Sequence, residues 1–381
     1  MSRVVLKPGK EKSLLNRHPW IFSGAIAARP SHAPGDIFPV YSSLDKMLGH
    51  AYFHPENSIA GRMLNFDSQN PLDAIRDSID RALDLRNSLV PESGRRLINA
   101  EGDQLPGLIV DQYRDVLVIQ IHTAGMELLK APIVEHLVFR LNPKTIYEKS
   151  VSPARHLEGL TDTKKLLYGP ETPEVIIEEH GIQYIVQPLE GQKTGFFLDQ
   201  REMRKTVLHL SRDKTVLNCF AYTGGFSLAA LKGGAAHVTS VEISPDACAL
   251  AARHAFDPAK HSIVQADVFD FLRTNPLNYN LVILDPPAFA KKRSDVETAS
   301  KGYRDLNRFA FQKMPSNSIL ITSSCSAYMD ASLFQQLVFQ AAAETGRFVR
   351  ILGRHTQALD HPVSIYHPEG DYLKSLVLHV S

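Results

Sequence analysis

Cysteine is scarce in this chain of 381 residues, and its scarcity excludes several classes of protein. The three cysteines are Cys219, Cys248 and Cys325, an odd and small number that does not make the disulfide framework of a secreted domain. The sequence contains no C-x-x-C pair, so the usual ligand spacing of a zinc site is missing too. Each cysteine therefore needs an explanation in packing or in chemistry.

Long apolar runs and an excess of charge are also missing. No run approaches the roughly 18 apolar residues of a membrane span, and the first residues, MSRVVLKPGKEKSLL, lack the apolar segment of a signal peptide. The formal net charge is +1, so any RNA or DNA site must come from local basic clusters. We therefore predict a soluble cytoplasmic protein with no membrane partner.

The first half of the chain contains two regions with different sequence patterns. Residues 1–66 are short apolar runs cut by Gly and Pro, which predicts a small all-β domain. Residues 67–190 begin with a helical pattern that Asn70 can cap and in which Pro71 suits the first turn. Strands, a helix around 126–140 and a hairpin with His180-Gly181 as its turn follow, which predicts an α+β domain. A basic cluster in residues 1–18 is by itself typical of a solvated surface.

Residues 191–381 alternate between strands and helices. The strands are continuous apolar runs such as TVLNCFA and YNLVILD, which is typical of a parallel sheet covered on both faces. The last two apolar runs lie too close together for a helix between them, so we expect them to add an antiparallel edge. The predicted fold class is therefore α/β, with a Rossmann-like C-terminal domain.

Glycine and carboxylate residues follow four successive strands of this predicted sheet. They are Gly224 in the segment FAYTGGFSL, Glu242, Asp267 and the Asp285 of DPPAF. Ligands of such sheets bind beyond the carboxyl ends of the strands, where Glu242 can accept hydrogen bonds from ribose and Asp267 can face an adenine amino group. No G-x-G-x-x-G is present, which favours a nucleoside without a phosphate chain. The alternatives are simple turn chemistry for the glycines and helix capping for Asp267.

These segments carry a resemblance to a known family. LNCFAYTGGFSL, SVEIS, LVILDPPAFAKK and SSCS resemble the class I S-adenosylmethionine (SAM) methyltransferases. GQKTGFFLDQREMR, together with LLNRHPWIFSGAI, NAEGDQLPGLIVDQY, DHPV and EGDYLK, resembles RNA methyltransferases with an N-terminal PUA domain, whose best-known members make 5-methylcytosine in 23S ribosomal RNA. The resemblance implies a β-barrel PUA domain (1–66), an α+β middle domain (67–190) and a Rossmann-like SAM-dependent methyltransferase domain (191–381).

The resemblance also implies a set of cofactor contacts. Phe197, Asp199 and Arg201 would line or brace the methionine side of SAM, although Arg201 has a plain salt bridge as its alternative role. The remaining contacts implied for SAM are Tyr222 and Gly224 beneath it, Glu242 at the ribose, Asp267 at the adenine, and Asp285 between the cofactor and the target base.

Cys325 follows the predicted fifth strand and stands between two serines in SSCS. The resemblance implies that it is the catalytic nucleophile, because a thiolate that adds to carbon 6 of cytosine makes carbon 5 able to accept a methyl group. Asp285 would hydrogen-bond or protonate the cytosine ring nitrogen. The alternative role for Cys325 is packing of a strand-to-helix turn, which is also the role expected of Cys219 and Cys248. Where some RNA cytosine-5 methyltransferases have a second cysteine, this chain has Pro286-Pro287-Ala288.

The predicted partner is ribosomal RNA with a single-stranded or flipped-out target base. Lys291 and Lys292, which follow DPPAF, and Arg304 are candidates for phosphate contacts, with a solvated charged surface as the alternative. Two other functions are compatible with the sequence: methylation of another atom such as guanine N7, which needs no nucleophilic cysteine, and a non-catalytic RNA-binding assembly factor. The sequence leaves open the target nucleotide and whether the protein forms a homodimer.

Overall fold

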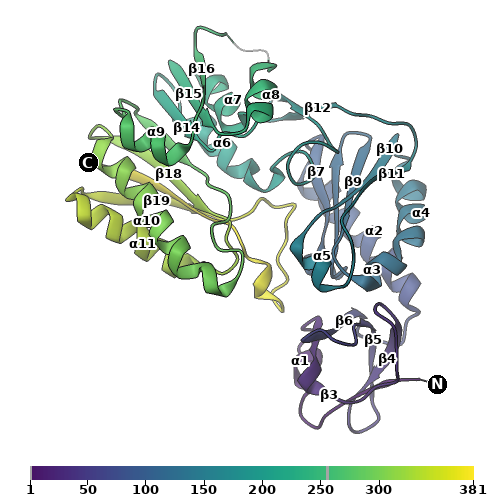
Figure 1. The fold of residues 1–381 in the computed structure, drawn as a ribbon. Helices are drawn as coiled ribbons and strands as arrows, with labels where there is room; N and C mark the ends of the chain where they lie inside the picture. The colour runs from purple at the N-terminus through teal and green to yellow at the C-terminus, as the bar shows by residue number, and fades with distance from the viewer. Residues whose placement is uncertain (1, 255–256) are drawn as a thin grey trace. The chain divides into compact units, whose positions relative to one another are not determined.

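A computed structural model describes residues 2–254 and 257–381 of the chain as two compact units (Figure 1). The first unit comprises the chain up to Glu179 together with Ile185–Leu198 and Leu359–Gly370, and the second comprises His180–Tyr184, Asp199–Ala358 and Asp371–Ser381. The division into three domains at residues 66 and 190 stays a prediction. Among the described residues, no helix combines the length and the apolar character needed to cross a membrane.

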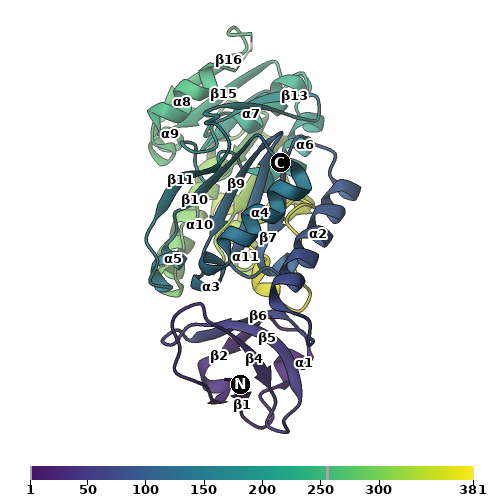
Figure 2. The same ribbon diagram turned by 90° about the vertical axis from the view of Figure 1, so that its right-hand side faces the viewer.

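The N-terminal part of the first unit is a six-stranded sheet with the strand order β2-β6-β5-β4-β1-β3. Strands β1 and β4 pair in parallel and the other neighbours pair antiparallel. The sheet curves around a small apolar core that includes Leu6, Ile21 and Phe53 (Figure 2). The elements of this part are β1 (Val4–Leu6), α1 (Lys12–Leu15), β2 (Trp20–Phe22), β3 (Ile26–Ala28), β4 (Ile37–Tyr41), β5 (Met47–Phe53) and β6 (Ile59–Asn65).

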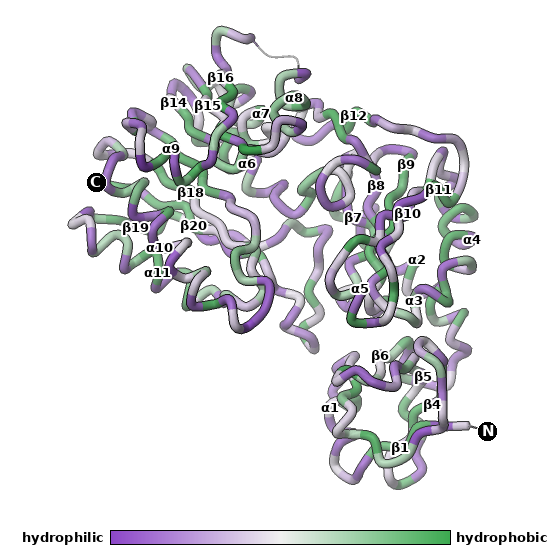
Figure 3. Tube along the Cα trace, in the orientation of Figure 1, coloured by the Kyte–Doolittle hydropathy of each residue, from purple (hydrophilic) through white to green (hydrophobic). Residues whose placement is uncertain are grey.

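The rest of the first unit has a five-stranded sheet in the order β11-β10-β9-β8-β7. Its central strands, such as β9, consist mostly of apolar residues (Figure 3). The core of this part also includes residues of the helices α2 and α4. The elements are α2 (Pro71–Leu89), β7 (Gly94–Asn99), β8 (Leu108–Tyr113), β9 (Val116–Ile121), α3 (Ala124–Leu128), α4 (Lys130–Leu141), β10 (Thr145–Ser150), α5 (Pro153–Leu157) and β11 (Thr163–Tyr168).

Two local predictions in this region are confirmed. The Oδ1 of Asn70 accepts a hydrogen bond of 2.9 Å from the backbone N–H of Leu72, and α2 begins at Pro71. The predicted hairpin consists of β12 (Val175–Glu179) and β13 (Ile182–Val186). Its turn residues His180 and Gly181 have φ angles of 51° and 72°, and two positive values are what a type I′ turn requires.

The second unit contains a seven-stranded sheet in the order β16-β15-β14-β17-β18-β20-β19. The first five of these strands are parallel to one another, as predicted. The elements are α6 (Arg201–Leu210), β14 (Thr215–Cys219), α7 (Gly225–Lys232), β15 (His237–Glu242), α8 (Pro245–Ala252), β16 (His261–Gln265), α9 (Val268–Thr274), β17 (Leu281–Leu284), α10 (Val296–Lys313), β18 (Ser318–Ser324), α11 (Ala331–Thr345), β19 (Val349–His355) and β20 (Lys374–Val380).

The position of the last two strands, β19 and β20, determines which residues lie beside the end of β18. β20 inserts between β18 and β19 and is antiparallel to both, so β19 forms the outer edge. Because β20 runs against β18, the first residues of β20 lie beside the carboxyl end of β18. The strand order reverses between β14 and β17, and in α/β sheets this switch point is where ligands bind.

Candidate active site

The loop after β14 has an unusual backbone. Phe220, Tyr222 and Gly224 have φ angles of 57°, 49° and 81°, in the left-handed region. Such a conformation costs free energy for residues other than glycine, and it is often retained at ligand sites. Gly224 is also the N-cap of α7, where its missing side chain permits the positive φ. The loop therefore presents backbone groups at the start of a helix, in the position predicted for the cofactor.

Glu242, at the end of β15, is tied to this loop. Its Oε2 accepts a hydrogen bond of 2.8 Å from the backbone N–H of Tyr222, and its Oε1 accepts one of 2.9 Å from the N–H of Ser244. The residue is only 8% exposed. The structure thus brings Tyr222 and Glu242 together, and hydrogen bonds to both oxygens orient the carboxylate.

Asp267 follows β16, whose last residue Gln265 pairs with Glu242 in the parallel sheet. Its Oδ1 accepts a hydrogen bond of 3.0 Å from the backbone N–H of Asp270 and caps α9. The capping role weighed from the sequence is therefore present. A contact with adenine would use the other oxygen of the same carboxylate, and this contact stays a prediction.

Asp285 follows β17 and is partly buried. Its Oδ1 accepts a hydrogen bond of 2.8 Å from the Nε2 of Gln200, a buried residue that the sequence analysis did not single out. The neighbouring Asp199 is also buried, and its Oδ2 accepts a hydrogen bond of 2.7 Å from the hydroxyl of Tyr372. The segment at the start of α6 and the segment before β20 therefore both support the carboxylates of this site.

Arg201 and Phe197, the other two residues predicted on the methionine side, have different surroundings. Arg201 is the first residue of α6 and is 2% exposed. Phe197 belongs to the first unit, where the Nζ of Lys193 lies 4.4 Å from the centroid of its ring. The predicted contacts of both residues with the cofactor stay predictions.

Cys325 is the first residue after β18. Its neighbours Ser324 and Ser326 are fully buried, whereas Cys325 itself is half-buried. The Sγ of Cys325 lies 3.8 Å from the backbone oxygen of Pro286, the residue after Asp285. The thiol and the carboxylate therefore stand at the ends of adjacent parallel strands.

Ser326 fixes the position of the turn that carries Cys325. Its Oγ accepts a hydrogen bond of 3.1 Å from the backbone N–H of Ala290, in the loop after β17. It also shares a hydrogen bond of 3.0 Å with the hydroxyl of Tyr303, on α10. The two strand-end segments that bear Asp285 and Cys325 are thus held to each other and to the helix that covers them.

Lys374, the first residue of β20, is a member of this site that the sequence analysis missed. It pairs with Ser324 across the antiparallel strands and is 7% exposed. Its Nζ donates hydrogen bonds of 2.7 Å to the backbone oxygens of Ser326 and Tyr372. Burial lowers the pKa of Lys374, while the negative charges of Asp371 and of a Cys325 thiolate act to raise it. The structure therefore places a buried amino group beside the cysteine turn.

The other two cysteines have surroundings that disfavour a thiolate. Cys219 is fully buried within β14, and burial raises the pKa of its thiol. Burial and the nearby charge of Glu242 also raise the pKa of Cys248. No group of His, Cys, Asp or Glu side chains that could hold a metal ion occurs in residues 2–254 and 257–381.

The candidate RNA contacts fall into two groups. Lys291 and Lys292 have exposed side chains, and their backbone N–H groups both donate to the Oδ2 of Asp295 at 3.2 Å. Arg304 instead lies on α10, with its Nε 3.7 Å from the Oε1 of Glu344 on α11. The structure thus leaves the two lysines directed to solvent and engages Arg304 between two helices. Their contacts with RNA stay predictions.

Comparisons with known proteins agree with this architecture. A family described as PUA-like domain matches residues 4–66, and a family described as S-adenosylmethionine-dependent methyltransferase matches residues 163–354. Two relatives are named ribosomal RNA large subunit methyltransferase I. The protein of Aliivibrio fischeri is 40% identical to this chain over 392 residues, which span 99% of this chain and 99% of the relative. The protein of Pseudoalteromonas atlantica is 41% identical over 392 residues, which span 100% of this chain and 99% of the relative.

Solved structures give the same result. The crystal structure of a protein described as a methyltransferase complexed with SAH has a TM-score of 0.86 and 27% identity, and the alignment covers 99% of this chain and 100% of that one. Together the matches confirm the predicted α/β fold with a PUA-like domain and a methyltransferase domain, and they confirm SAM as the cofactor.

Proposed function

Because this chain belongs to the ribosomal RNA large subunit methyltransferase I family of SAM-dependent enzymes, we propose that it methylates carbon 5 of a cytosine in 23S ribosomal RNA. The observation that supports this position is the half-buried Cys325, whose Sγ lies 3.8 Å from the backbone oxygen beside Asp285. Methylation of guanine N7 has no use for a thiol at this place, because that nitrogen is itself a nucleophile. Carbon 5 of cytosine is not, and it requires covalent activation.

The residues at the strand ends fit SAM. The donor set contains carboxylates and no phosphate-binding glycine fingerprint, which suits a nucleoside without phosphates. Glu242, oriented by two backbone N–H groups, would hold the ribose hydroxyls, and Asp267 would hold the adenine amino group. When bound, SAM supplies an electrophilic methyl group. Asp199, Tyr222, Gly224 and Arg201 would surround it.

Residues of the chain would activate the cytosine ring for methyl transfer. The Cys325 thiolate adds to carbon 6, and the new C–S bond leaves electron density at carbon 5. That carbon bonds to the methyl group as the bond between the methyl group and the sulfonium sulfur breaks. Loss of the carbon-5 proton then re-forms the ring double bond and expels the thiolate. Asp285, held by Gln200, would hydrogen-bond the ring nitrogen and stabilise the adduct. The buried amino group of Lys374 would favour the thiolate over the thiol.

The RNA must present the cytosine unpaired or flipped out of its helix, because the thiol attacks the face of the ring. The exposed Lys291 and Lys292 follow the Asp285 loop and would bind phosphates near that base, which predicts an affinity that falls as salt rises.

The test is to incubate the protein with labelled SAM and 23S ribosomal RNA, digest the RNA to nucleosides and separate them. Label in 5-methylcytidine is the expected result. Label in 7-methylguanosine would refute the proposed atom. RNA binding without SAM affinity and without any labelled nucleoside would favour a non-catalytic assembly factor.

A further inference from the structure

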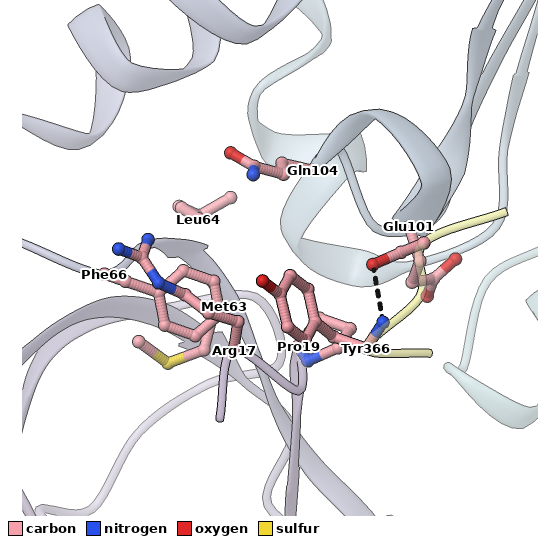
Figure 4. A pocket seen from close by; sticks show the side chains of 9 residues that line it. Arg17, Pro19, Met63, Leu64, Phe66, Glu101, Gln104 and Tyr366 are labelled. Atoms are coloured by element: carbon pink, nitrogen blue, oxygen red, sulfur yellow. Dashed lines mark hydrogen bonds between the residues drawn. The ribbon is translucent and has the colours of Figure 1, made fainter. Parts of the chain in front are cut away.

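A pocket of about 290 Å³ lies in the first unit (Figure 4). It is formed where three parts of that unit meet: the N-terminal sheet with the loop before β2, the short segment after β7, and residues 364–366. A volume of this order suits a small planar group rather than a folded segment of protein.

The surfaces of this pocket differ in chemistry. Met63 and Leu64 are 2% exposed and provide an apolar floor. Phe66 and Tyr366 contribute aromatic rings, and Tyr366 is 52% exposed. The guanidinium of Arg17 lies 5.4 Å from the centroid of the Phe66 ring.

The rim adds polar groups suited to the edge of a base. Glu101 and Gln104 contribute a carboxylate and an amide. The Oε1 of Glu101 accepts a hydrogen bond of 2.9 Å from the indole Nε1 of Trp20, which leaves acceptor capacity on the same carboxylate. The pocket thus combines flat apolar surfaces with one cation, one anion and one amide.

Two residues of this pocket have a strained backbone. Arg17 and Gln104 have φ angles of 63° and 59°, a region that costs about 1 kcal/mol or more for residues other than glycine. Hydrogen bonds hold both conformations: the N–H of Arg17 donates to the oxygen of Leu14 at 2.9 Å, and the N–H of Gln104 to the oxygen of Glu101 at 3.3 Å. Strain of this kind is often retained where it orients a functional side chain.

The segment that carries Tyr366 is anchored on both sides of it. The Nδ2 of Asn99 donates a hydrogen bond of 3.0 Å to the oxygen of Pro362, and the ring of His367 lies 4.4 Å from that of Trp20. The N–H of Tyr366 itself donates to the Oγ of Ser364 at 3.3 Å. The wall of the pocket is therefore organised before any ligand arrives, which reduces the entropy lost on binding.

We propose that this pocket binds an unpaired nucleotide of the RNA substrate, with its base against Tyr366 and its phosphate near Arg17. The inference rests on the proposed RNA substrate but adds a second contact, on the first unit. An acidic peptide fits less well, because its carboxylates offer no flat face to stack on the aromatic rings and no donor for Glu101. A nucleotide uses every surface present: the rings stack on the base, Glu101 and Gln104 meet its edge, and the guanidinium meets the phosphate.

The chain carries its own reporter for this test. Trp20 is the single tryptophan of the protein, and its indole N–H is bonded to Glu101 of the pocket. We expect titration of the full-length protein with a short unstructured RNA oligonucleotide to change the fluorescence of Trp20. Titration with free nucleoside monophosphates separates occupancy by a single nucleotide from binding that needs a strand.

Tyr366→Ala should weaken binding of the oligonucleotide about tenfold and reduce the change in fluorescence, because one base stacked on one aromatic ring contributes about that much. Tyr366→Phe should retain both, because it keeps the ring. Arg17→Gln should weaken binding and lower its dependence on salt, whereas Lys12→Gln, which replaces an exposed lysine outside the pocket, is the matched control for charge.

Wild-type affinity and an unchanged fluorescence response in Tyr366→Ala would overturn the proposal. The outcome is separate from that of the proposed reaction. If the wild-type protein formed no 5-methylcytidine but Tyr366→Ala still lost affinity for RNA, the pocket would stand and the assignment of the reaction would fail.

Discussion

The Nζ of Lys374 donates a hydrogen bond of 2.7 Å to the backbone oxygen of Ser326, the residue after Cys325. This bond fixes a buried amino group beside the turn that carries the thiol. A nearby positive charge stabilises a thiolate relative to a thiol, and only the thiolate attacks carbon 6. We therefore expect Lys374 to act through Cys325, as a positioning residue.

Lys374→Met removes the charge and keeps much of the volume. We expect the rate at neutral pH to fall about tenfold, because a one-unit rise in the pKa of a thiol lowers its thiolate fraction by about that factor below the pKa. The pH at which activity rises should shift upward, since the thiolate would form only at higher pH. The measurement is the rate of methyl transfer as a function of pH.

Lys374→Arg is the matched control, because it keeps a cation at the same place. It should recover part of the rate at neutral pH. A role in folding alone would lower activity by the same factor at every pH in Lys374→Met, and that result would exclude the electrostatic role.

Cys325→Ala should reduce methyl transfer to background while binding of SAM stays near the wild-type value. The side chain is half-buried directly after β18, so its removal leaves no large cavity in the core. Labelled methyl incorporation measures the reaction, and calorimetry measures SAM affinity.

Cys248→Ala is the corresponding control for loss of a thiol. It lies on α8, and burial and Glu242 raise the pKa of its thiol, so we expect its activity to be close to wild type. Substantial activity in Cys325→Ala would contradict the covalent route and support transfer to an atom that is already nucleophilic.

The sequence could predict the features that depend on local pattern. The five apolar strands, the acids at their ends, the cap at Asn70 and the turn at His180 follow from periodicity and side-chain chemistry within a few residues. The predicted helix at 126–140 illustrates the limit, because the structure has α3 and α4, separated at Leu129.

The features that the sequence missed depend on contacts between distant segments. Lys374 meets Ser324 only because β20 runs antiparallel to β18, and no local pattern sets that register. Gln200 meets Asp285 across 85 positions in the chain. Arg17 belongs to the basic cluster in residues 1–18, and its position beside Phe66 depends on the folded sheet.

Glu242→Gln should weaken SAM binding about tenfold or more. The amide places an NH2 group where one carboxylate oxygen stood, so the N–H of either Tyr222 or Ser244 faces a donor in place of its acceptor. The side chain also loses the charge that would strengthen the bonds to ribose. Calorimetric titration with SAM measures the change. Asp246→Asn removes an exposed carboxylate from the first turn of α8 and should bind SAM as the wild type does. Equal losses in the two variants would point to general electrostatics and against the ribose contact.

His122 predicts a pH dependence of stability in the first unit. Burial, together with the positive charges of Arg96 and Arg155, lowers the pKa of His122 from 6.5 to about 4. Between these two values the unfolded chain binds a proton at this site and the folded chain does not, so stability falls as pH decreases from about 6.5 to about 4. His122→Gln removes this contribution. The melting temperature of the variant minus that of the wild type should therefore increase steadily as the pH is lowered through that range. Any constant offset from altered packing does not change with pH.

His209→Gln, at an exposed position on α6, should show no such trend. If the difference between His122→Gln and wild type were the same at pH 7 and at pH 5, His122 would not be held neutral by the fold.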